Sequence, residues 1–445
     1  MLPTVTLPKN CQRLVVGLSG GVDSVVLLHW LTQQVTAAEQ SALPVLALHV
    51  NHQLSANADR WQQQMEQLCA RWNVPLQVQT VTVTVHGQGL EQAARNARYD
   101  AFEAELQSGD VLAVAHHLND QAETLMLRLM RGTGVLGLSA MAALRPLGQG
   151  RLWRPLLGVA KSDILRYAEV HALTWVDDES NRDERFSRNF LRHRILPKLA
   201  MHWPQVASKL AQTAEHARET QALLNDYAAT DFAAVDHRIE RMGTSISLAA
   251  LQRLSWPRQK HLVRYWLQLL GECPPAAAHL SELSKLLGAQ ADAQPTLVLG
   301  RYSVCRYQQR LYLVPSEAVG RAEPRWQLSE PLTFRTRCQL PDGSLVRIDG
   351  FDGELSVRYR QGGERAHPEG RAHSQTLKKL LQEYALEPWL RARVPLIYRG
   401  DTLVAVGDLW LQQGAHTLCG LAAGAPLKVQ WTLSPHPNNA KLSAI

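Results

Sequence analysis

Short apolar runs recur at nearly constant spacing in the first third of the chain, and this spacing constrains the fold more than any other feature. Runs that favour strands begin at residues 14, 44, 76 and 111, so successive starts are 30, 32 and 35 residues apart. Helical patterns fill the gaps, as between residues 58 and 72, where apolar side chains recur on one helical face. Strands that alternate with helices in this way indicate parallel βαβ units. We therefore expect an α/β domain built on a doubly wound parallel sheet.

The rest of the chain changes character, which indicates further domains. A length of 445 residues exceeds what one compact core usually holds. The pattern becomes mainly helical after residue 198, strand signals return at 296–306 and 311–314, and a stretch with three prolines at 315–331 indicates a linker. Beyond it we expect a hairpin turn at 340–343 and a helix capped by Ser374. We predict a catalytic domain over 1–217, a mainly helical central domain over 218–316 and a small α+β domain over 332–445.

Composition narrows the class of protein. The net charge of +7 permits a polyanionic partner without requiring one. The six cysteines are scattered and form no CxxC pair, which is typical of a reduced compartment and speaks against a zinc ribbon or a redox motif. The N-terminus has no apolar signal core, and no run approaches the ~18 apolar residues that span a bilayer. We expect a cytoplasmic protein with no membrane partner.

A glycine-containing loop joins the first strand to the first helix and predicts a nucleotide site. Its residues are Ser19, Gly20, Gly21, Val22, Asp23 and Ser24. The glycines let the backbone approach an anion, and the amides and dipole of the following helix favour negative charge there. The loop lacks the Lys-Ser/Thr ending of a Walker A motif, so we expect it to hold ATP for release of pyrophosphate. Asp23 would repel phosphate by itself, which predicts a bridging Mg²⁺; a plain glycine turn is the structural alternative.

Two polar residues follow the fourth strand-like run. His116 and Asp120 lie four residues apart, where that run ends and a helix begins. Doubly wound sheets bind ligands outside the carboxyl ends of their strands, so both side chains could hold magnesium or phosphate, or guide a proton. The alternative is that Asp120 and Glu123 form a capping box and that His116 is a satisfied strand-end histidine. The spacing alone leaves both interpretations open.

Several segments together resemble the tRNA(Ile)-lysidine synthetase family of N-type ATP pyrophosphatases. The loop at 19–24 alone is typical of the whole superfamily. The narrower resemblance rests on HVNH at 49–52, LEQAARNARY at 90–99, HHLNDQAET at 116–124, RPLL at 154–157, DESN at 178–181, RNFLR at 188–192, GGE at 362–364, KKLL at 378–381 and PWLRARVPL at 388–396. One departure is Asn119, where many members carry an aspartate. The acidic role is therefore placed on Asp120.

The resemblance implies a two-step ligase reaction. ATP adenylates the C2 oxygen of the wobble cytidine of tRNA(Ile) with a CAU anticodon, and the ε-amine of free L-lysine then displaces AMP. The product, lysidine, changes the codon read from AUG to AUA. The implied partners are this tRNA, lysine, ATP and Mg²⁺, and not DNA. The implied catalytic residues are Asp23, His116, Asp120, Arg188 and Arg192, with Asp23 and Asp120 on the magnesium ion.

Basic segments provide candidates for binding substrate. Residues 182–198 carry six basic and two acidic groups, and residues 355–394 carry eight and four, so each has a local charge of +4. Phosphate contacts of this kind position RNA without reading its bases, and we expect Lys378 and Lys379 to hold the tRNA body. Ordinary solvated helices are the alternative.

Three further candidates, Glu91, Arg95 and Arg98, share one helix at i, i+4 and i+7. They could bind lysine or the anticodon loop, or Glu91 and Arg95 could form only a surface pair.

Two other functions remain open from the residues. A tRNA thiolation enzyme could use the same ATP domain, although the chain lacks the CxxC pair that some of them use. A non-catalytic RNA-binding module with a relic loop is a second alternative, against which the intact loop and Asp120 argue.

Overall fold

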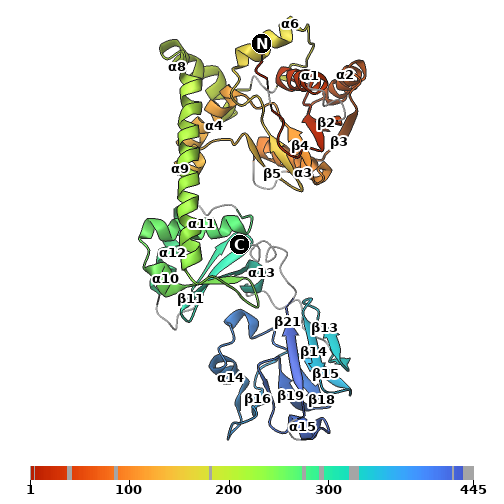
Figure 1. Cartoon of the computed structure of the whole chain (residues 1–445), viewed down its shortest axis with the longest axis vertical. Coiled ribbons are helices and arrows are strands. Elements are labelled where there is room, and N and C mark those ends of the chain that lie inside the picture. The colour runs from red at the N-terminus through yellow and green to blue at the C-terminus, as the bar shows by residue number, and fades with distance from the viewer. Residues whose placement is uncertain are drawn as a thin grey trace. The chain divides into compact units, whose positions relative to one another are not determined.

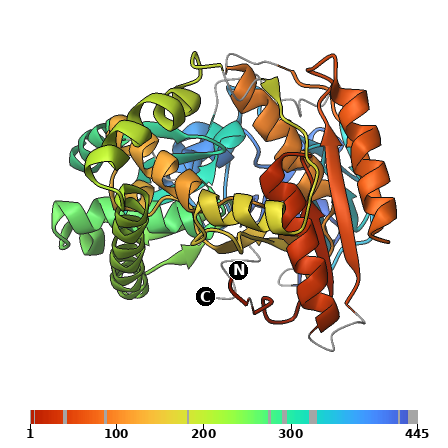
Figure 2. The same ribbon diagram turned by 90° about the horizontal axis from the view of Figure 1, so that it is seen from above.

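The computed structural model describes residues 2–4, 6–37, 43–84, 89–179, 183–272, 277–289, 295–319, 330–422 and 425–433. These residues form two compact units, Met1–Leu223 and Leu224–Ile445. Figure 1 colours the first unit from red to yellow-green and the second from green to blue. The helix α9 (Val206–Ala234) passes through the boundary, and Figure 2 views it nearly along its axis.

The first unit alternates strands and helices in the predicted order. Its elements are β1 (Arg13–Gly17), α1 (Val22–Ala37), β2 (Val45–Asn51), α2 (Ala58–Arg71), β3 (Leu76–Thr80), α3 (Leu90–Glu105), β4 (Asp110–Ala113), α4 (Leu118–Met130), α5 (Val135–Leu138), β5 (Leu144–Leu147), β6 (Gly150–Trp153), α6 (Lys161–Val170), α7 (Ser187–Phe190), the π-helical turn η2 (Leu191–Ile195), α8 (Leu196–His202) and the first part of α9. The predicted strands begin within one residue of the observed ones, but β3 ends at Thr80 instead of Val85, and β4 ends at Ala113, which leaves His116 in the following segment.

The strands form a six-stranded sheet in the order β3-β2-β1-β4-β6-β5. All neighbours pair in parallel except β5, which pairs antiparallel with β6 at the edge. Leu14, Val15 and Val16 in the central strand are fully buried, as expected where helices cover both faces. Side chains of α1, α2 and α6 pack on one face and those of α3 on the other. The predicted doubly wound α/β fold is confirmed.

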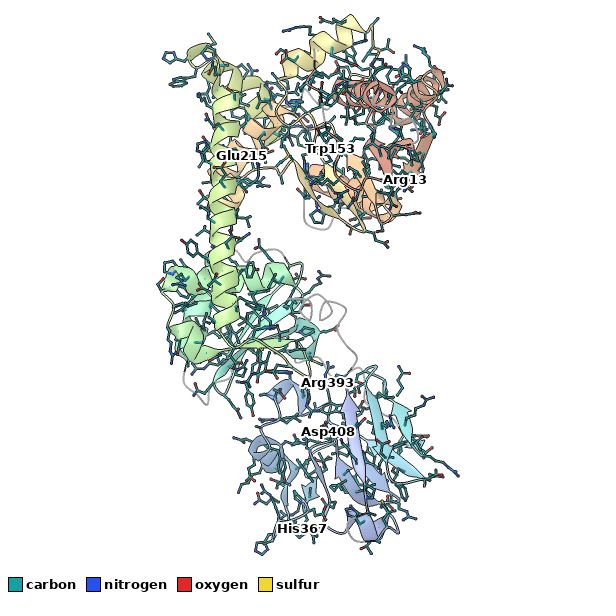
Figure 3. All side chains as sticks on the ribbon, viewed as in Figure 1. Arg13, Trp153, Glu215, His367, Arg393 and Asp408 are labelled. Atoms are coloured by element: carbon teal, nitrogen blue, oxygen red, sulfur yellow. The ribbon has the colours of Figure 1, made fainter. Side chains whose placement is uncertain are left out.

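Ion pairs join the amino end of the central strand β1 to α3 and β4. Arg13, labelled in Figure 3, lies 2.5 Å from Asp110 and 3.2 Å from Glu105 through its guanidinium nitrogens. These ion pairs lie at the amino ends of β1 and β4. Ligands of a doubly wound sheet bind at the other edge, outside the carboxyl ends of the strands.

The turn η2 joins α7 to α8 in one continuous helical segment. Leu196 N donates to Leu191 O, an i to i−5 bond. Pro197 follows directly and has no N–H to continue a regular ladder. Arg188 and Arg192 lie on this segment.

The second unit begins with a five-stranded antiparallel sheet in the order β7-β8-β11-β10-β9. Its elements are β7 (Arg238–Ile239), β8 (Thr244–Ser247), α10 (Leu248–Gln252), α11 (Trp256–Leu269), α12 (Ala277–Gly288), β9 (Thr296–Leu299), β10 (Tyr302–Tyr307), β11 (Arg310–Pro315) and α13 (Ser316–Val319). The predicted run 296–306 is divided into β9 and β10, and β7 and β8 carried no sequence signal. The greater part of the predicted linker lies outside the described residues.

The C-terminal part of this unit is rich in strands. Its elements are β12 (Leu332–Phe334), β13 (Arg337–Gln339), β14 (Leu345–Asp349), β15 (Leu355–Arg358), β16 (Arg365–Ala366), β17 (Gln375–Thr376), α14 (Leu377–Glu383), the 3-10 turn η3 (Pro388–Leu390), β18 (Leu396–Arg399), β19 (Thr402–Val406), β20 (Trp410–Leu411), α15 (Ala415–Leu418) and β21 (Lys428–Thr432). They form sheets β12-β15-β18-β19-β20 and β13-β14-β21 and the pair β16-β17.

Two local predictions in this part meet different outcomes. The hairpin turn is confirmed, because Gly343 N donates to Leu340 O between β13 and β14. The predicted helix is present as α14, but its N-cap is Thr376; Ser374 instead accepts a bond from Arg365. The predicted domain boundaries stay predictions. Within the described residues, no helix combines the length and apolarity needed to cross a bilayer.

Candidate active site

The glycine-containing loop lies between β1 and the first turn of α1. Gly20 has a φ of +92°, a region that side chains with a Cβ rarely adopt, whereas Gly21 has no such constraint. The hydroxyl of Ser24 accepts bonds from Ser19 N and Gly20 N at 3.2 Å each and donates to Gly21 O at 2.9 Å. The loop thus gathers amide and hydroxyl groups at the N-terminus of a 16-residue helix, a setting that favours anions.

Asp23 faces a lysine that the sequence analysis did not single out. Its Oδ1 lies 2.6 Å from Lys161 Nζ. Lys161 is the first residue of α6, and its backbone N–H donates to Asn119 Oδ1 at 3.2 Å. Asn119, left unassigned from the sequence, therefore helps to fix the start of that helix. A separation of 138 residues between Lys161 and Asp23 gave the sequence no spacing signal.

Asp120 occupies the third position of α4 and has two kinds of partner. Its Oδ2 accepts the backbone N–H of His117 at 3.0 Å, so the capping residues are His117 and Asp120. Its Oδ1 accepts bonds from Arg188 at 2.8 Å and Arg192 at 3.1 Å. Asp120 thus joins a helix cap to two arginines from another segment.

Glu123 is not the capping residue that the D-x-x-E alternative places there. Its side chain is 1% exposed and accepts Nε of Arg188 and Nε of Arg192, both at 2.7 Å, and Nη2 of Arg192 at 2.9 Å. Asp120, Glu123, Arg188 and Arg192 therefore form one buried network of two carboxylates and two guanidinium groups, which we call the ion-pair network. Two residues of the basic segment 182–198 are thus paired rather than solvated.

Electrostatics keeps Asp120, Arg188 and Arg192 ionised. Burial alone would raise the pKa of Asp120, but His117 and Arg188 outweigh it, and the pKa lies well below the usual range. Burial alone would lower the pKa of Arg188 and of Arg192, but for Arg188 the charges of Asp120 and Glu123, and for Arg192 the hydrogen bond and charge of Glu123, raise it overall. The network therefore presents fixed charges and fixed donors at neutral pH.

The two histidines after β4 have separate surroundings. His117 Nε2 lies 3.8 Å from Asp23 and 3.5 Å from Asp120, so His117 is the imidazole between the two carboxylates. His116 Nδ1 accepts a bond from Arg154 at 3.3 Å. Burial lowers the pKa of His116 to about 3, so this ring is neutral at physiological pH. The structure thus adds His117 to the residues near Asp23, while His116 faces the α3 side.

Asp23 and Asp120 could both ligate magnesium, because each offers a carboxylate oxygen beside His117. The described residues contain no group of three or more side chains suited to holding a metal. Magnesium usually keeps several waters and binds through one or two carboxylates plus substrate phosphates, so two aspartates fit an ion that arrives with ATP.

The remaining candidates are distributed over both units. Arg98 Nε donates to His52 at 3.3 Å, and Arg95 Nη2 lies 3.5 Å from the Tyr99 hydroxyl. The side chain of Glu91 lies outside the described residues, so its expected pair with Arg95 stays a prediction. Lys378 and Lys379 are exposed on α14 in the second unit, where Lys379 lies 3.9 Å from Glu383.

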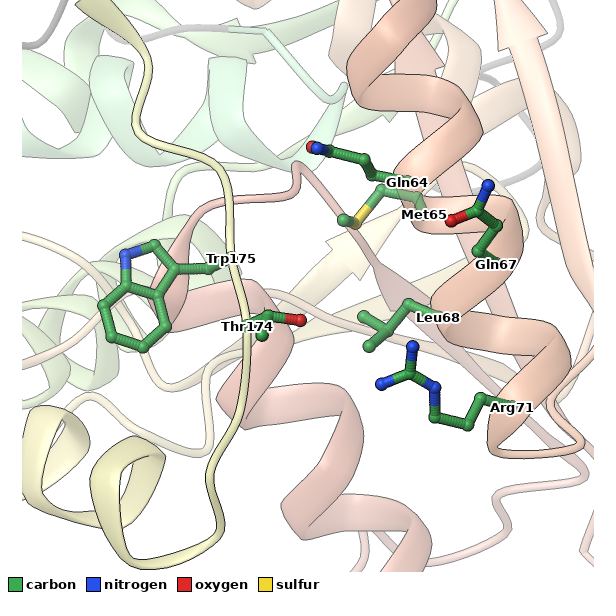
Figure 4. A pocket seen from close by; sticks show the side chains of 7 residues that line it. All are labelled: Gln64, Met65, Gln67, Leu68, Arg71, Thr174 and Trp175. Carbon is green, nitrogen blue, oxygen red and sulfur yellow. The ribbon is translucent and has the colours of Figure 1, made fainter.

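A pocket of about 190 Å³ lies beside the loop, between α2 and the segment after α6. Figure 4 shows Gln64, Met65 and Arg71 of α2 on one side of it and the segment with Thr174 and Trp175 on the other. The next residue, Val176, donates its N–H to Gly20 O at 2.9 Å. None of the predicted site residues lines this pocket.

Family models match three segments of the chain. They describe a PP-loop domain over residues 2–199, a TilS substrate binding domain over 246–312 and a TilS substrate C-terminal domain over 355–430. Among solved structures, the U34-tRNA thiolase NcsA from Methanococcus maripaludis is similar over 47% of this chain and 74% of its own, at 19% identity and with a TM-score of 0.39.

Curated relatives match almost the whole chain. The tRNA(Ile)-lysidine synthase of Pseudomonas aeruginosa is 44% identical over 405 residues, which are 88% of this chain and 89% of that protein. The enzyme of Pseudomonas fluorescens is 42% identical over 429 residues, 92% and 94% of the two chains. The enzyme of Coxiella burnetii is 36% identical over 423 residues, 93% and 92%.

Proposed function

Because this chain belongs to the tRNA(Ile)-lysidine synthase family, a family of ATP-using, tRNA-modifying ligases, we propose that it joins lysine to the wobble cytidine of tRNA(Ile) in two steps. In the first step, the C2 oxygen of the cytidine attacks the α-phosphorus of ATP and pyrophosphate leaves. In the second, the ε-amine of lysine attacks C2, loses a proton and expels AMP. The cytidine of a CAU anticodon becomes lysidine, and the codon read changes from AUG to AUA.

The loop and its neighbours serve the first step. Residues Ser19–Ser24 hold the triphosphate with backbone amides and hydroxyls at the start of α1. Lys161, 2.6 Å from Asp23, brings a cation to the same place and can exchange its carboxylate partner for a phosphate. Asp23 and Asp120 would hold Mg²⁺ together with the phosphates, and the ion would supply positive charge beside the leaving pyrophosphate.

The ion-pair network and His116 serve the second step. The incoming amine has an unperturbed pKa of about 10.4 and must lose a proton before it attacks. A pKa of about 3 makes His116 a poor proton acceptor. With Nδ1 accepting from Arg154, its Nε2 carries the hydrogen and can donate to an oxygen at the reacting centre. The carboxylates of the network are already paired with its arginines, and Arg188 and Arg192, whose side chains are 21% and 35% exposed, can donate to the phosphate of the departing AMP.

One observation carries this proposal: relatives 36–44% identical over about nine-tenths of the chain share one activity by name. The test incubates the purified protein with ATP, labelled lysine and tRNA(Ile) bearing CAU, and measures label in the RNA and AMP released. A UAU version of the tRNA should accept no label. Sulfur incorporation without lysine would favour a thiolation enzyme, and tRNA binding without ATP cleavage would favour a binding module.

Asp23→Asn provides a sharper version of the assay. Loss of the carboxylate should abolish AMP formation while the affinity for tRNA stays within about twofold, because Asp23 acts on the nucleotide. Asp163→Asn is the matched control, since Asp163 also lies in a first helical turn but is 44% exposed and lies 3.5 Å from Arg166. AMP formation by Asp23→Asn at the wild-type rate would contradict the proposal that Asp23 acts on the nucleotide.

A further inference from the structure

Three arginines surround Tyr99 on the α3 side of the sheet edge. The Cζ atoms of Arg95 and Arg145 lie 5.1 and 5.5 Å from the centroid of the Tyr99 ring. Arg154 is 5% exposed, and its charge and hydrogen bond lower the pKa of the same phenol. These residues come from α3, from β5 and from the segment that follows β6. We call Arg95, Arg145 and Arg154 the arginine cluster.

The arginine cluster differs from the ion-pair network in its partners. Arg154 donates to Ala142 O at 2.6 Å and to His116, and Arg145 donates to Pro146 O at 3.0 Å. Among the described residues, none of the three forms a salt bridge with a carboxylate. Arg145 and Arg154 thus donate to neutral acceptors among the described residues, whereas Glu91, the expected partner of Arg95, has its side chain outside them.

The charges of the cluster act on one another and on Tyr99. Burial and then the nearby arginines lower the pKa of Arg154 overall, although Tyr99 opposes them. Burial alone would raise the pKa of Tyr99, but Arg95, Arg154 and Arg145 lower it overall. The shift of Arg154 follows first from burial, whereas the shift of Tyr99 has the direction expected beside positive charge, which an anion bound there would offset.

The cluster lies at the same edge of the sheet as the nucleotide loop. Arg145 pairs with Leu152 in the register of β5 and β6, one position from the carboxyl end of β6. Arg154 contacts His116, and the next residue, His117, faces Asp23 and Asp120. An anion on the cluster would therefore lie near His116.

We propose that the arginine cluster binds a backbone phosphate of the tRNA and thereby positions the target cytidine beside His116. The proposal rests on the proposed function and adds a site to it. Guanidinium groups suit phosphate because their planar donors match its oxygens. ATP and pyrophosphate offer the same chemistry, so the test must separate the two sources of phosphate.

The test compares Arg145→Gln and the double variant Arg95→Gln/Arg145→Gln with Arg151→Gln. Arg151 is a matched control on the same hairpin, nearer the amino end of β6, where it donates to Lys9 O. Binding of tRNA(Ile) is measured by filter retention over a series of KCl concentrations, and binding of ATP is measured separately. For single-stranded RNA the slope of log affinity against log salt falls by ~0.7 for each phosphate that the protein no longer neutralises.

We expect the slope to fall by about 0.7, the contribution of one phosphate, in the double variant and by no more than about 0.7 in the single variant, with tRNA affinity reduced at least about tenfold in the double variant. ATP affinity and the Arg151→Gln variant should match the wild type. If Arg145→Gln fails to fold, Arg145→Lys keeps the charge and should retain the wild-type slope. An unchanged slope in the double variant overturns the proposal, as does weakened ATP binding with normal tRNA binding. Failure of the wild type itself to bind tRNA(Ile) would instead remove the proposed function.

Discussion

Replacing Glu123 by glutamine tests whether the ion-pair network holds the site together. The carboxylate is 1% exposed and accepts three bonds of 2.7 to 2.9 Å from Arg188 and Arg192. An amide of the same shape removes the charge and turns N–H donors toward guanidinium donors. Removing one partner of a buried pair typically costs about 3–5 kcal/mol. Because the arginine side chains are 21% and 35% exposed, water recovers part of this, and we expect a loss of about 2–3 kcal/mol.

Thermal unfolding followed by circular dichroism measures this loss. For a unit of this size, 1 kcal/mol shifts Tm by about 2–4 °C, so Glu123→Gln should melt about 5–10 °C below the wild type. Glu184→Gln is the matched control, because Glu184 pairs with Arg194 at 2.8 Å but the two side chains are 38% and 62% exposed. Its effect should stay below about 0.5 kcal/mol. Equal melting temperatures for the two variants would refute the reasoning from burial.

Three further predictions concern the loop, acid stability and tRNA binding. Gly20→Ala should destabilise the protein by about 1–2 kcal/mol in chemical denaturation, because the φ of Gly20 is +92°. Gly21→Ala should change the free energy of unfolding by less than about 0.5 kcal/mol. Equal losses in the two variants would show that Gly20 does not have the left-handed backbone conformation described above. His116 has a pKa of about 3 when folded and about 6.5 when unfolded, so stability is complete above pH 6.5 and is lost as the pH falls toward 3, by about 1–2 kcal/mol at pH 5. The same titration on His116→Asn should show a smaller loss between pH 6.5 and 5, and an identical curve would contradict this. Lys378→Gln/Lys379→Gln should weaken tRNA binding and flatten its salt dependence, and an unchanged slope would count against these exposed lysines as phosphate contacts.

The sequence predicted the first unit well because its signals are local. Buried runs such as Leu14–Leu18 and the change from period 2 to period 3.6 depend only on neighbouring residues. The glycine-containing loop was likewise placed between β1 and α1. Short strands such as β7, with two residues, exist only through pairing with β8 and carry no periodicity that could reveal them.

The side-chain pairs of the site were less accessible, because they join residues far apart in the chain. Lys161 reaches Asp23 across 138 residues, and Arg192 reaches Glu123 across 69. The spacing of Asp120 and Glu123 fitted a capping box equally well, and only the fold shows that Glu123 faces two arginines instead. The motif at 116–124 contains both His116 and His117, and only the fold shows that His117 lies 3.8 Å from Asp23.

Arg188 and Arg192 are paired with carboxylates, whereas Arg145 forms no salt bridge among the residues that the structure describes, and this contrast has a consequence for the effect of ionic strength. Mobile ions screen accessible charges over a Debye length of about 8 Å at physiological salt but reach buried pairs much less. The attraction between Arg145 and RNA is therefore exposed to competition from dissolved ions, whereas Glu123 and its guanidinium partners are shielded from it. Concentrated salt should thus raise KM for tRNA while kcat changes little, because binding of tRNA weakens before the arrangement of the buried ion pairs is disturbed.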